Sequence, residues 1–363
     1  IKDPERQKVY RKLIISVFEL ADSIYDAIRL KQSSSVEFEK KRVFGDKPAP
    51  DFKNYLSELE DFYLQEELKK LVDESEVKSS AKVADAKSHQ QKMEYLFYYL
   101  WFKNKYTPDV SEFLKQFFAS ELIAVPYKAF LVSAIVLSLK RYFDDDKFSV
   151  LFDVYYLDNP ELNQRALVGL LINLYKYDLR LPFYTEITGR LQILNEDPEF
   201  KQNLERVIIQ LIRTKETERI QQKIKDEIIP EMIKISPNLK DKINLEGLME
   251  ENMGDDKNPD WEEIFKDSPG LMDKMEEFSE LQMEGADVFM SSFSMLKSFP
   301  FFMDIHNWFI PFFPENPDVQ PFVDKEDQSN ETFIKVLEMA PILCNSDKYS
   351  FCFSIQNLPK ENR

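Results

Sequence analysis

The chain has 7 glycines in 363 residues, whereas an average soluble chain of this length carries about 25. Tight positive-φ turns and close approaches of the backbone to phosphate depend on glycine. No window reads G-x-G-x-x-G or G-x-x-x-x-G-K-[ST], so Rossmann and P-loop nucleotide folds of those kinds are excluded. The net charge of −17 disfavours binding to nucleic acid and to anionic membranes.

The rest of the composition is typical of helices joined by short turns. Charged residues make up 31% of the chain and aromatic residues 13%, and the hydrophobic content of 43% excludes wholesale disorder. Pro126 and Lys128 interrupt the longest apolar stretch, Leu122 to Leu139, so no transmembrane segment is expected. The two cysteines, Cys344 and Cys352, fit a reducing compartment, and we expect a cytoplasmic, all-α protein.

The first third predicts long helices. Pro4 opens a segment, residues 4–31, whose apolar residues recur at steps of three and four: Tyr10, Leu13, Val17, Ala21, Ile24 and Ile28. A polar connector leads to a second helix at about residues 52–72. Residues 73–90 are polar and are expected to form a loop that passes into an aromatic-rich helix, with His89 facing solvent.

The middle third contains a repeated pattern. Pro126, Pro160 and Pro198 each begin an apolar segment, and the intervening stretches 145–157 and 181–194 each fit one short helix. Helix pairs at this spacing are typical of HEAT and tetratricopeptide arrays, in which each pair covers the apolar face of its neighbour. The prediction is an α-α superhelix over residues 1–236, and an irregular helical bundle is the alternative.

The composition changes after residue 237. Lys240 to Asp287 holds 16 acidic and 5 basic residues, and an aromatic run follows from Trp261 to Phe313. We expect residues 237–330 to form an acidic and then aromatic-rich helical segment with a linker at 314–330. Residues 331–363 are expected to form a terminal helix pair, which could begin a further repeat region.

One segment of this region carries a resemblance. Ser279 to Phe293 reads SELQMEGADVFMSSF and continues through Phe299-Pro300-Phe301-Phe302 to Trp308 and Phe312. It resembles a segment near the end of the N-terminal helical region of large tetratricopeptide-repeat proteins from Bacteroides-type bacteria. The resemblance implies a helical scaffold followed by a repeat domain that would dock on it. It implies no catalytic residue and no cofactor.

Candidate chemistry in the sequence is sparse. Asp256, Asn258 and Asp260 have the spacing of a calcium loop, but Trp261 occupies the position that requires glycine, so no metal site is expected. His306 lies two residues from Asp304, and with Cys344 or Cys352 it could form an acid–base or thiol pair. Burial of these residues is the simpler interpretation. No catalytic constellation is found, and we expect a non-enzymatic protein.

The aromatic run offers the clearest interaction surface. It is too continuous and too often broken by proline to form one face of a helix, so part of it is expected to meet a neighbouring module, a partner or a ligand. The predicted function is a scaffold that binds a protein or peptide partner. The alternative is a helical ligand-binding protein with an aromatic pocket around Trp308. The candidate surface comprises Phe299, Phe301, Phe302, Trp308, Phe309, Phe312 and Phe313.

Overall fold

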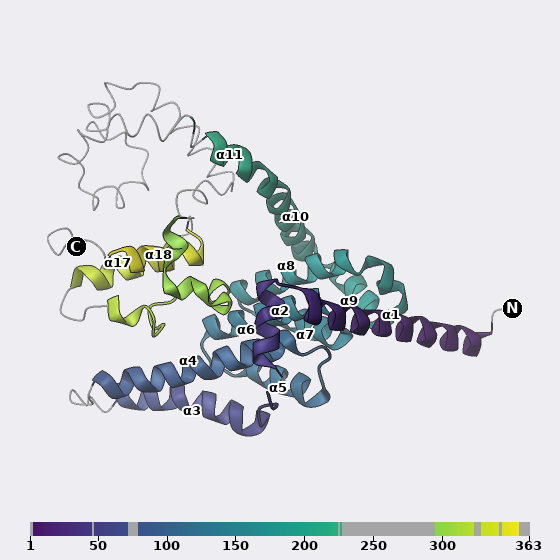
Figure 1. Cartoon of the computed structure of the whole chain (residues 1–363), viewed down its shortest axis with the longest axis horizontal. Coiled ribbons are helices and arrows are strands. Elements are labelled where there is room, and N and C mark those ends of the chain that lie inside the picture. Colours follow the sequence, from purple (N-terminus) through teal and green to yellow (C-terminus); the bar gives the residue numbers. More distant parts are fainter. Residues whose placement is uncertain are drawn as a thin grey trace. The chain divides into compact units, whose positions relative to one another are not determined.

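The computed structural model describes residues 3–45, 47–71, 79–223, 226, 295–322, 328–340 and 343–355. Helices and turns account for these ranges, and no strand occurs within them, which confirms the all-α prediction (Figure 1). Among the described helices, none combines the length and the apolar character needed to cross a bilayer.

The N-terminal helices are α1 (Pro4–Gln32), α2 (Val36–Phe44), α3 (Phe52–Leu71) and α4 (Ser79–Phe102). They are followed by α5 (Pro108–Ala119), α6 (Val125–Arg141), α7 (Asp145–Tyr155), α8 (Pro160–Lys176), the 3-10 helix η1 (Asp178–Phe183) and α9 (Thr185–Glu196). After α10 (Pro198–Arg213) come η2 (Thr214–Glu216) and α11 (Thr217–Lys223). The C-terminal part holds η4 (Met295–Ser298), η5 (Pro300–Met303), η6 (Ile305–Trp308), η7 (Gln320–Phe322), α17 (Gln328–Met339) and α18 (Asn345–Ile355).

Proline marks the starts of the helices, as the sequence predicts. Pro126, Pro160 and Pro198 lie in the first turns of α6, α8 and α10, where a missing N–H removes no helical hydrogen bond. Asn159 caps α8, because its side-chain oxygen accepts hydrogen bonds from the backbone N–H groups of Glu161 and Leu162 at 3.1 Å each.

The helices from α3 to α9 contact one another in an alternating order. One row is formed by α4, α6 and α8, each in contact with the next, and a second row by α5, α7 and α9 (Figure 1). The rows join where α7 contacts both α6 and α8, and α3 packs against α4 and α5. The second-row helices have 11 or 12 residues, whereas α6 and α8 have 17. Within each row, each helix therefore packs on the next but one along the chain.

The core lies between these rows and consists of aliphatic and aromatic side chains. Fully buried members include Phe97 of α4, Phe130 of α6 and Phe148 of α7, and the rings of Phe97 and Phe130 stack with centroids 4.3 Å apart. Gly169 permits the close contact of α8 with α6, because a Cβ at this position would lie 2.2 Å from Cγ2 of Val136.

The chain divides into two compact units, residues 1–204 together with 298–363, and residues 205–297. In the first unit the C-terminal segment packs against the helix rows. Arg165 of α8 donates a hydrogen bond to the carbonyl oxygen of Phe309 at 3.0 Å, and the ring of Phe313 meets that of Tyr127 edge-on at 5.3 Å. The domain limits at residues 236 and 330 stay predictions from the sequence.

Candidate functional site

Helix α1 docks on its unit through charged side chains. Asp22 forms two hydrogen bonds with the guanidinium of Arg180, at 2.5 and 2.7 Å. Asp26 contacts Arg141 and Lys41, each at 2.6 Å. Burial opposes ionisation of Asp26, but the two cations hold the pKa of its carboxyl below the ordinary value. Ion pairs therefore fix the middle of α1 to the unit.

The N-terminal half of α1 uses the same side. Arg11 donates from Nε to the carbonyl oxygen of Phe183 at 2.5 Å, and the ring of Phe18 meets that of Phe183 edge-on with centroids 5.8 Å apart. Glu19 forms an ion pair with Lys105. These contacts fix the rotation of α1 about its axis along most of its length.

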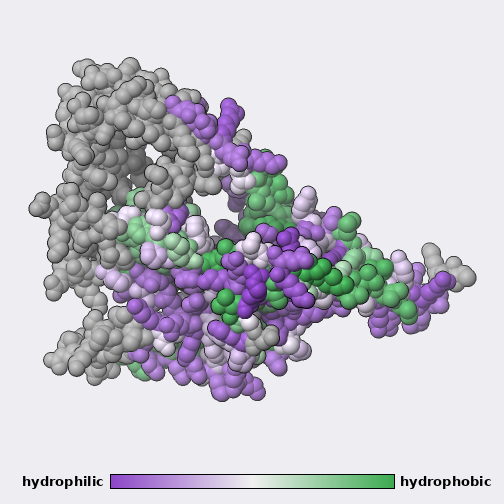
Figure 2. Space-filling model, in the orientation of Figure 1, coloured by the Kyte–Doolittle hydropathy of each residue, from purple (hydrophilic) through white to green (hydrophobic). Residues whose placement is uncertain are grey.

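The opposite side of α1 is apolar and exposed. Figure 2 shows hydrophobic residues gathered along this helix. We call this surface the outer face of α1; its large side chains are between 48% and 64% exposed, and they are Val9, Tyr10, Leu13, Val17, Leu20, Ile24 and Ile28. An amphipathic helix normally buries its apolar face, whereas in α1 the apolar face is turned away from the unit.

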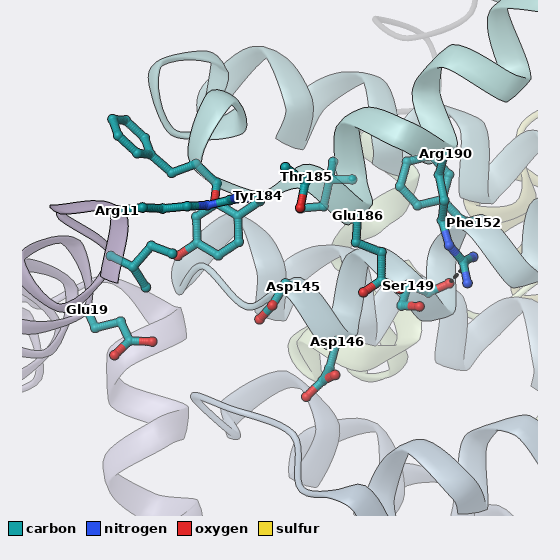
Figure 3. Close-up of a pocket in the computed structure, with 13 residues that line it drawn as sticks. Arg11, Glu19, Asp145, Asp146, Ser149, Phe152, Tyr184, Thr185, Glu186 and Arg190 are labelled. Atoms are coloured by element: carbon teal, nitrogen blue, oxygen red, sulfur yellow. Dashed lines mark hydrogen bonds between the residues drawn. The ribbon is translucent and has the colours of Figure 1, made fainter. Parts of the chain in front are cut away.

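A cavity of about 310 Å³ lies beneath the docked side of α1, between α7, η1 and α9. Figure 3 shows Asp145, Asp146 and Glu186 among the lining side chains, with Arg11 and Arg190 at opposite ends. Burial and the two neighbouring carboxylates raise the pKa of Asp146. Both arginines are engaged with other groups, since Arg11 binds the Phe183 carbonyl and Arg190 pairs with Asp153 at 2.6 Å. The cavity therefore favours cationic groups over anionic ones.

The aromatic segment that the sequence singles out forms consecutive 3-10 turns rather than one helix, because Pro300 and Pro311 interrupt it. Its predicted surface residues fall into two environments. Phe302, Phe312 and Phe313 are buried, whereas four others are partly or substantially exposed: Phe299, Phe301, Phe309 and Trp308.

Most of these rings pack within the protein. Phe299 and Phe301 contact Phe353 of α18, and Phe301 and Phe312 contact Tyr349. On the other side of the segment, Phe309 stacks on Phe97 with centroids 6.0 Å apart. The segment therefore links the C-terminal helices to α4 and α6, and its role as an interaction surface stays a prediction.

Trp308 is the most exposed of the predicted aromatic residues, at 46%. Its indole N–H donates to the carbonyl oxygen of Phe302 at 2.9 Å, and its ring lies against that of Phe302 at 5.1 Å. The polar atom of this indole is therefore satisfied by the chain itself rather than directed toward a ligand.

The two histidines are both buried. His306 Nδ1 lies 3.1 Å from the hydroxyl of Tyr98, and burial lowers the pKa of His306 to about 4. His89 was expected to face solvent, and this expectation is wrong: it is 3% exposed, and its ring stacks on Phe62 with centroids 4.3 Å apart. Among the described residues neither ring nitrogen of His89 has a hydrogen-bond partner, and burial lowers its pKa to about 4.

The cysteines are both free. The expected burial holds for Cys352 but is wrong for Cys344, which is exposed. Cys344 contacts Ser346 and Asp347, and burial raises the pKa of its thiol. These contacts lie within the start of α18, whereas His306 contacts Tyr98 of α4. The cytoplasmic location stays a prediction.

The calcium-like spacing at residues 256–267 falls outside the described residues. Within the ranges that the structure describes, no three His, Cys, Asp or Glu side chains are grouped so as to hold a metal ion.

A buried ion pair fixes the connection between α4 and α5. Lys147 is fully buried, and its ammonium donates to the carbonyl oxygens of Lys103 and Asn104 at 3.0 and 2.6 Å. It lies 3.9 Å from Asp144, whose carboxylate accepts the N–H of Tyr106 at 2.8 Å. Burial lowers the pKa of Lys147 and raises that of Asp144. All polar contacts of this pair go to the protein's own backbone, which indicates a structural role.

Comparison with protein-family models, with curated proteins and with solved structures finds no match to this chain. The resemblance to tetratricopeptide-repeat proteins therefore stays a prediction from the sequence.

Proposed function

We propose that this chain is a non-enzymatic protein–protein interaction module of the helical-repeat type, and that the outer face of α1 is its binding surface. The observation that carries the proposal is the orientation of α1. One side of α1 forms contacts with the unit, such as that of Asp22 with Arg180. The apolar side is exposed and available to a partner.

The shape and chemistry of the outer face favour a protein over a small molecule. It is the convex side of a helix of 29 residues rather than a cavity, and an apolar stripe at helical spacing is complementary to a second amphipathic helix. Nucleic acid is disfavoured, because the large exposed side chains of this face are apolar and the whole chain is acidic.

The arrangement of α3 to α9 supports the repeat part of the proposal. In each row, every helix contacts the next but one along the chain. This resembles a solenoid, in which each helix pair packs on the following pair. We therefore interpret α4 to α9 as three stacked helix pairs of a HEAT- or tetratricopeptide-like superhelix. The pairs would provide a rigid support that holds α1 in place.

Site-specific photocrosslinking in the cells that make the protein tests this function. A benzoylphenylalanine in place of Leu20, which is 62% exposed on the outer face, is compared with one in place of Leu179, which is 80% exposed elsewhere. We expect a discrete protein adduct from position 20 only, with another copy of the chain counting as a protein. Equal labelling at the two positions, or no protein adduct at position 20, would contradict the proposal.

A further inference from the structure

The outer face of α1 has the register of a coiled coil. Six apolar residues follow one another at steps of three, four, three, four and three: Tyr10, Leu13, Val17, Leu20, Ile24 and Ala27. This is the alternation of the a and d positions of a heptad, with Tyr10, Val17 and Ile24 at a and the other three at d. All six are exposed. These six positions fit the seam of a two-helix coiled coil, and apolar residues beside them, Val9, Ile14 and Ile28, widen the stripe.

The residue types bear on the number of helices. Val17 and Ile24 at a are β-branched, and Leu13 and Leu20 at d are γ-branched, a combination that favours two strands in a parallel coiled coil. We infer that α1 pairs with the α1 of a second copy of this chain in a parallel coiled coil. This inference rests on the proposed function, because it names the partner of the same face.

The residues that flank the seam permit identical helices to pair. The e and g positions hold no charge; they are Ile14, Ala21 and Ile28 on one side and Val9, Ser16 and Ser23 on the other. Like charges at these positions would oppose the pairing of two copies. The helix itself bears six basic and four acidic residues, so the negative net charge of the chain resides elsewhere.

The protein's own unit leaves room for the second helix. The residues through which α1 docks occupy positions b, c and f, on the side opposite the seam: Arg11, Phe18, Glu19, Asp22 and Asp26. Ser23 is the exception at position g, where its hydroxyl lies 2.8 Å from that of Tyr142. The contacts that hold α1 therefore leave the side chains of the a and d positions exposed.

The area is sufficient for a specific dimer. The seven large side chains of the outer face present roughly 500 Å² of apolar surface per copy, if each side chain carries about 120 Å². Two copies would together remove roughly 1,000 Å² from water, which is the size at which specific interfaces between proteins begin.

The molar mass of the full chain in solution tests the pairing. We expect about 86 kDa, twice the chain mass of 43.0 kDa, by sedimentation equilibrium at micromolar concentration. Leu13→Glu with Leu20→Glu should give the mass of one chain. The matched control, Leu179→Glu with Ile193→Glu, changes two residues that are also more than 60% exposed but lie outside α1, and it should remain a dimer. Circular dichroism establishes that both variants keep their helices, as expected for changes at exposed positions.

The direction of the pair is tested by Tyr10→Cys in a Cys344→Ser background. In a parallel pair the two introduced thiols face each other at the same level and form a disulfide on mild oxidation. In an antiparallel pair centred on the seam, position 10 of one copy would face Ala27 of the other. The two introduced thiols would then lie about 25 Å apart along the helices, and no disulfide would form.

A parent chain that remains monomeric, or a dimer that survives the two glutamates, would overturn the inference. If the parent is monomeric but position 20 still crosslinks a different protein, the second-copy inference fails and the proposed function stands. If position 20 crosslinks no protein of any kind, both fail.

Discussion

The imidazole of His89 is buried, and neither of its nitrogens has a hydrogen-bond partner within the part of the chain that the structure describes, so its burial has a pH-dependent consequence. Its folded-state pKa of about 4 lies below the value of 6.5 expected for the unfolded chain. Between these pH values the unfolded chain binds a proton that the folded chain lacks. The part of the free energy of unfolding that depends on a neutral His89 is therefore fully present above pH 6.5. It is lost as the pH falls toward 4. At pH 5 the loss from this group is about 2 kcal/mol.

His89→Phe should remove this term, because phenylalanine fits among Phe62, Tyr63 and Tyr127 without a group to protonate. Chemical denaturation at pH 8 and pH 5 measures it. The variant should lose about 2 kcal/mol less stability than the parent between the two pH values. His306 is present in both proteins and cancels in the comparison. An identical pH dependence of the two proteins would show that His89 is not buried as a neutral ring.

Lys147 provides a second test at the level of single residues. Lys147→Met leaves the carboxylate of Asp144 buried without its cation and frees the carbonyl oxygens of Lys103 and Asn104, so the free energy of unfolding should fall by roughly 3–5 kcal/mol. Lys105→Met removes an exposed pair with Glu19 and should cost less than about 1 kcal/mol. Urea unfolding of the two variants measures these losses. Equal losses of unfolding free energy in the two variants would contradict the structural role of Lys147.

Among the elements, the contact between α6 and α8 depends on Gly169. Gly169→Ala would place a methyl group 2.2 Å from Val136, so overpacking should destabilise the protein by roughly 1–3 kcal/mol in thermal or urea unfolding. Gly189 of α9 is the matched control, since a Cβ there meets nothing within 4 Å. Gly189→Ala should stabilise the protein by up to about 1 kcal/mol through helix propensity.

Combining Gly169→Ala with Val136→Ala tests whether the clash with Val136 causes the destabilisation. If the clash causes the loss, the alanine at 169 should cost much less in the Val136→Ala background than in the parent. A loss of the same size in both backgrounds would mean that α6 and α8 do not approach each other as described.

The helices themselves were largely predictable from local signals. Pro4, Pro126, Pro160 and Pro198 mark starts that the structure confirms, and the step of three and four along residues 10–28 predicts α1. The polar character of residues 73–90 predicts a loop that passes into a helix, but α4 already begins at Ser79, and residues 73–78 lie outside the described ranges. Local composition failed there because contacts with distant residues, such as that of His89 with Phe62, stabilise the helix.

The direction in which α1 presents its apolar side could not be predicted from its periodicity. Periodicity shows that a helix has two faces, but it does not show which face meets the rest of the chain. That choice depends on pairs distant in sequence, such as Asp22 with Arg180. The sequence therefore predicts the candidate surface in the aromatic run instead. Of that run, Phe302, Phe312 and Phe313 are buried in the protein.

For the whole molecule, the central proposal is that a second copy of this chain covers the outer face of α1. The thiol reactivity of Ala27→Cys tests it in the full chain with Cys344→Ser, because Ala27 lies on the seam and its small side chain tolerates the change. Ala119→Cys, at the exposed end of α5, is the control. Both positions are exposed in a single chain.

We predict that the thiol at position 27 reacts at least about tenfold more slowly than the thiol at position 119 at micromolar concentration, and that dilution restores its rate, because dissociation of the pair exposes it. Equal rates at the two positions at every concentration would contradict the claim.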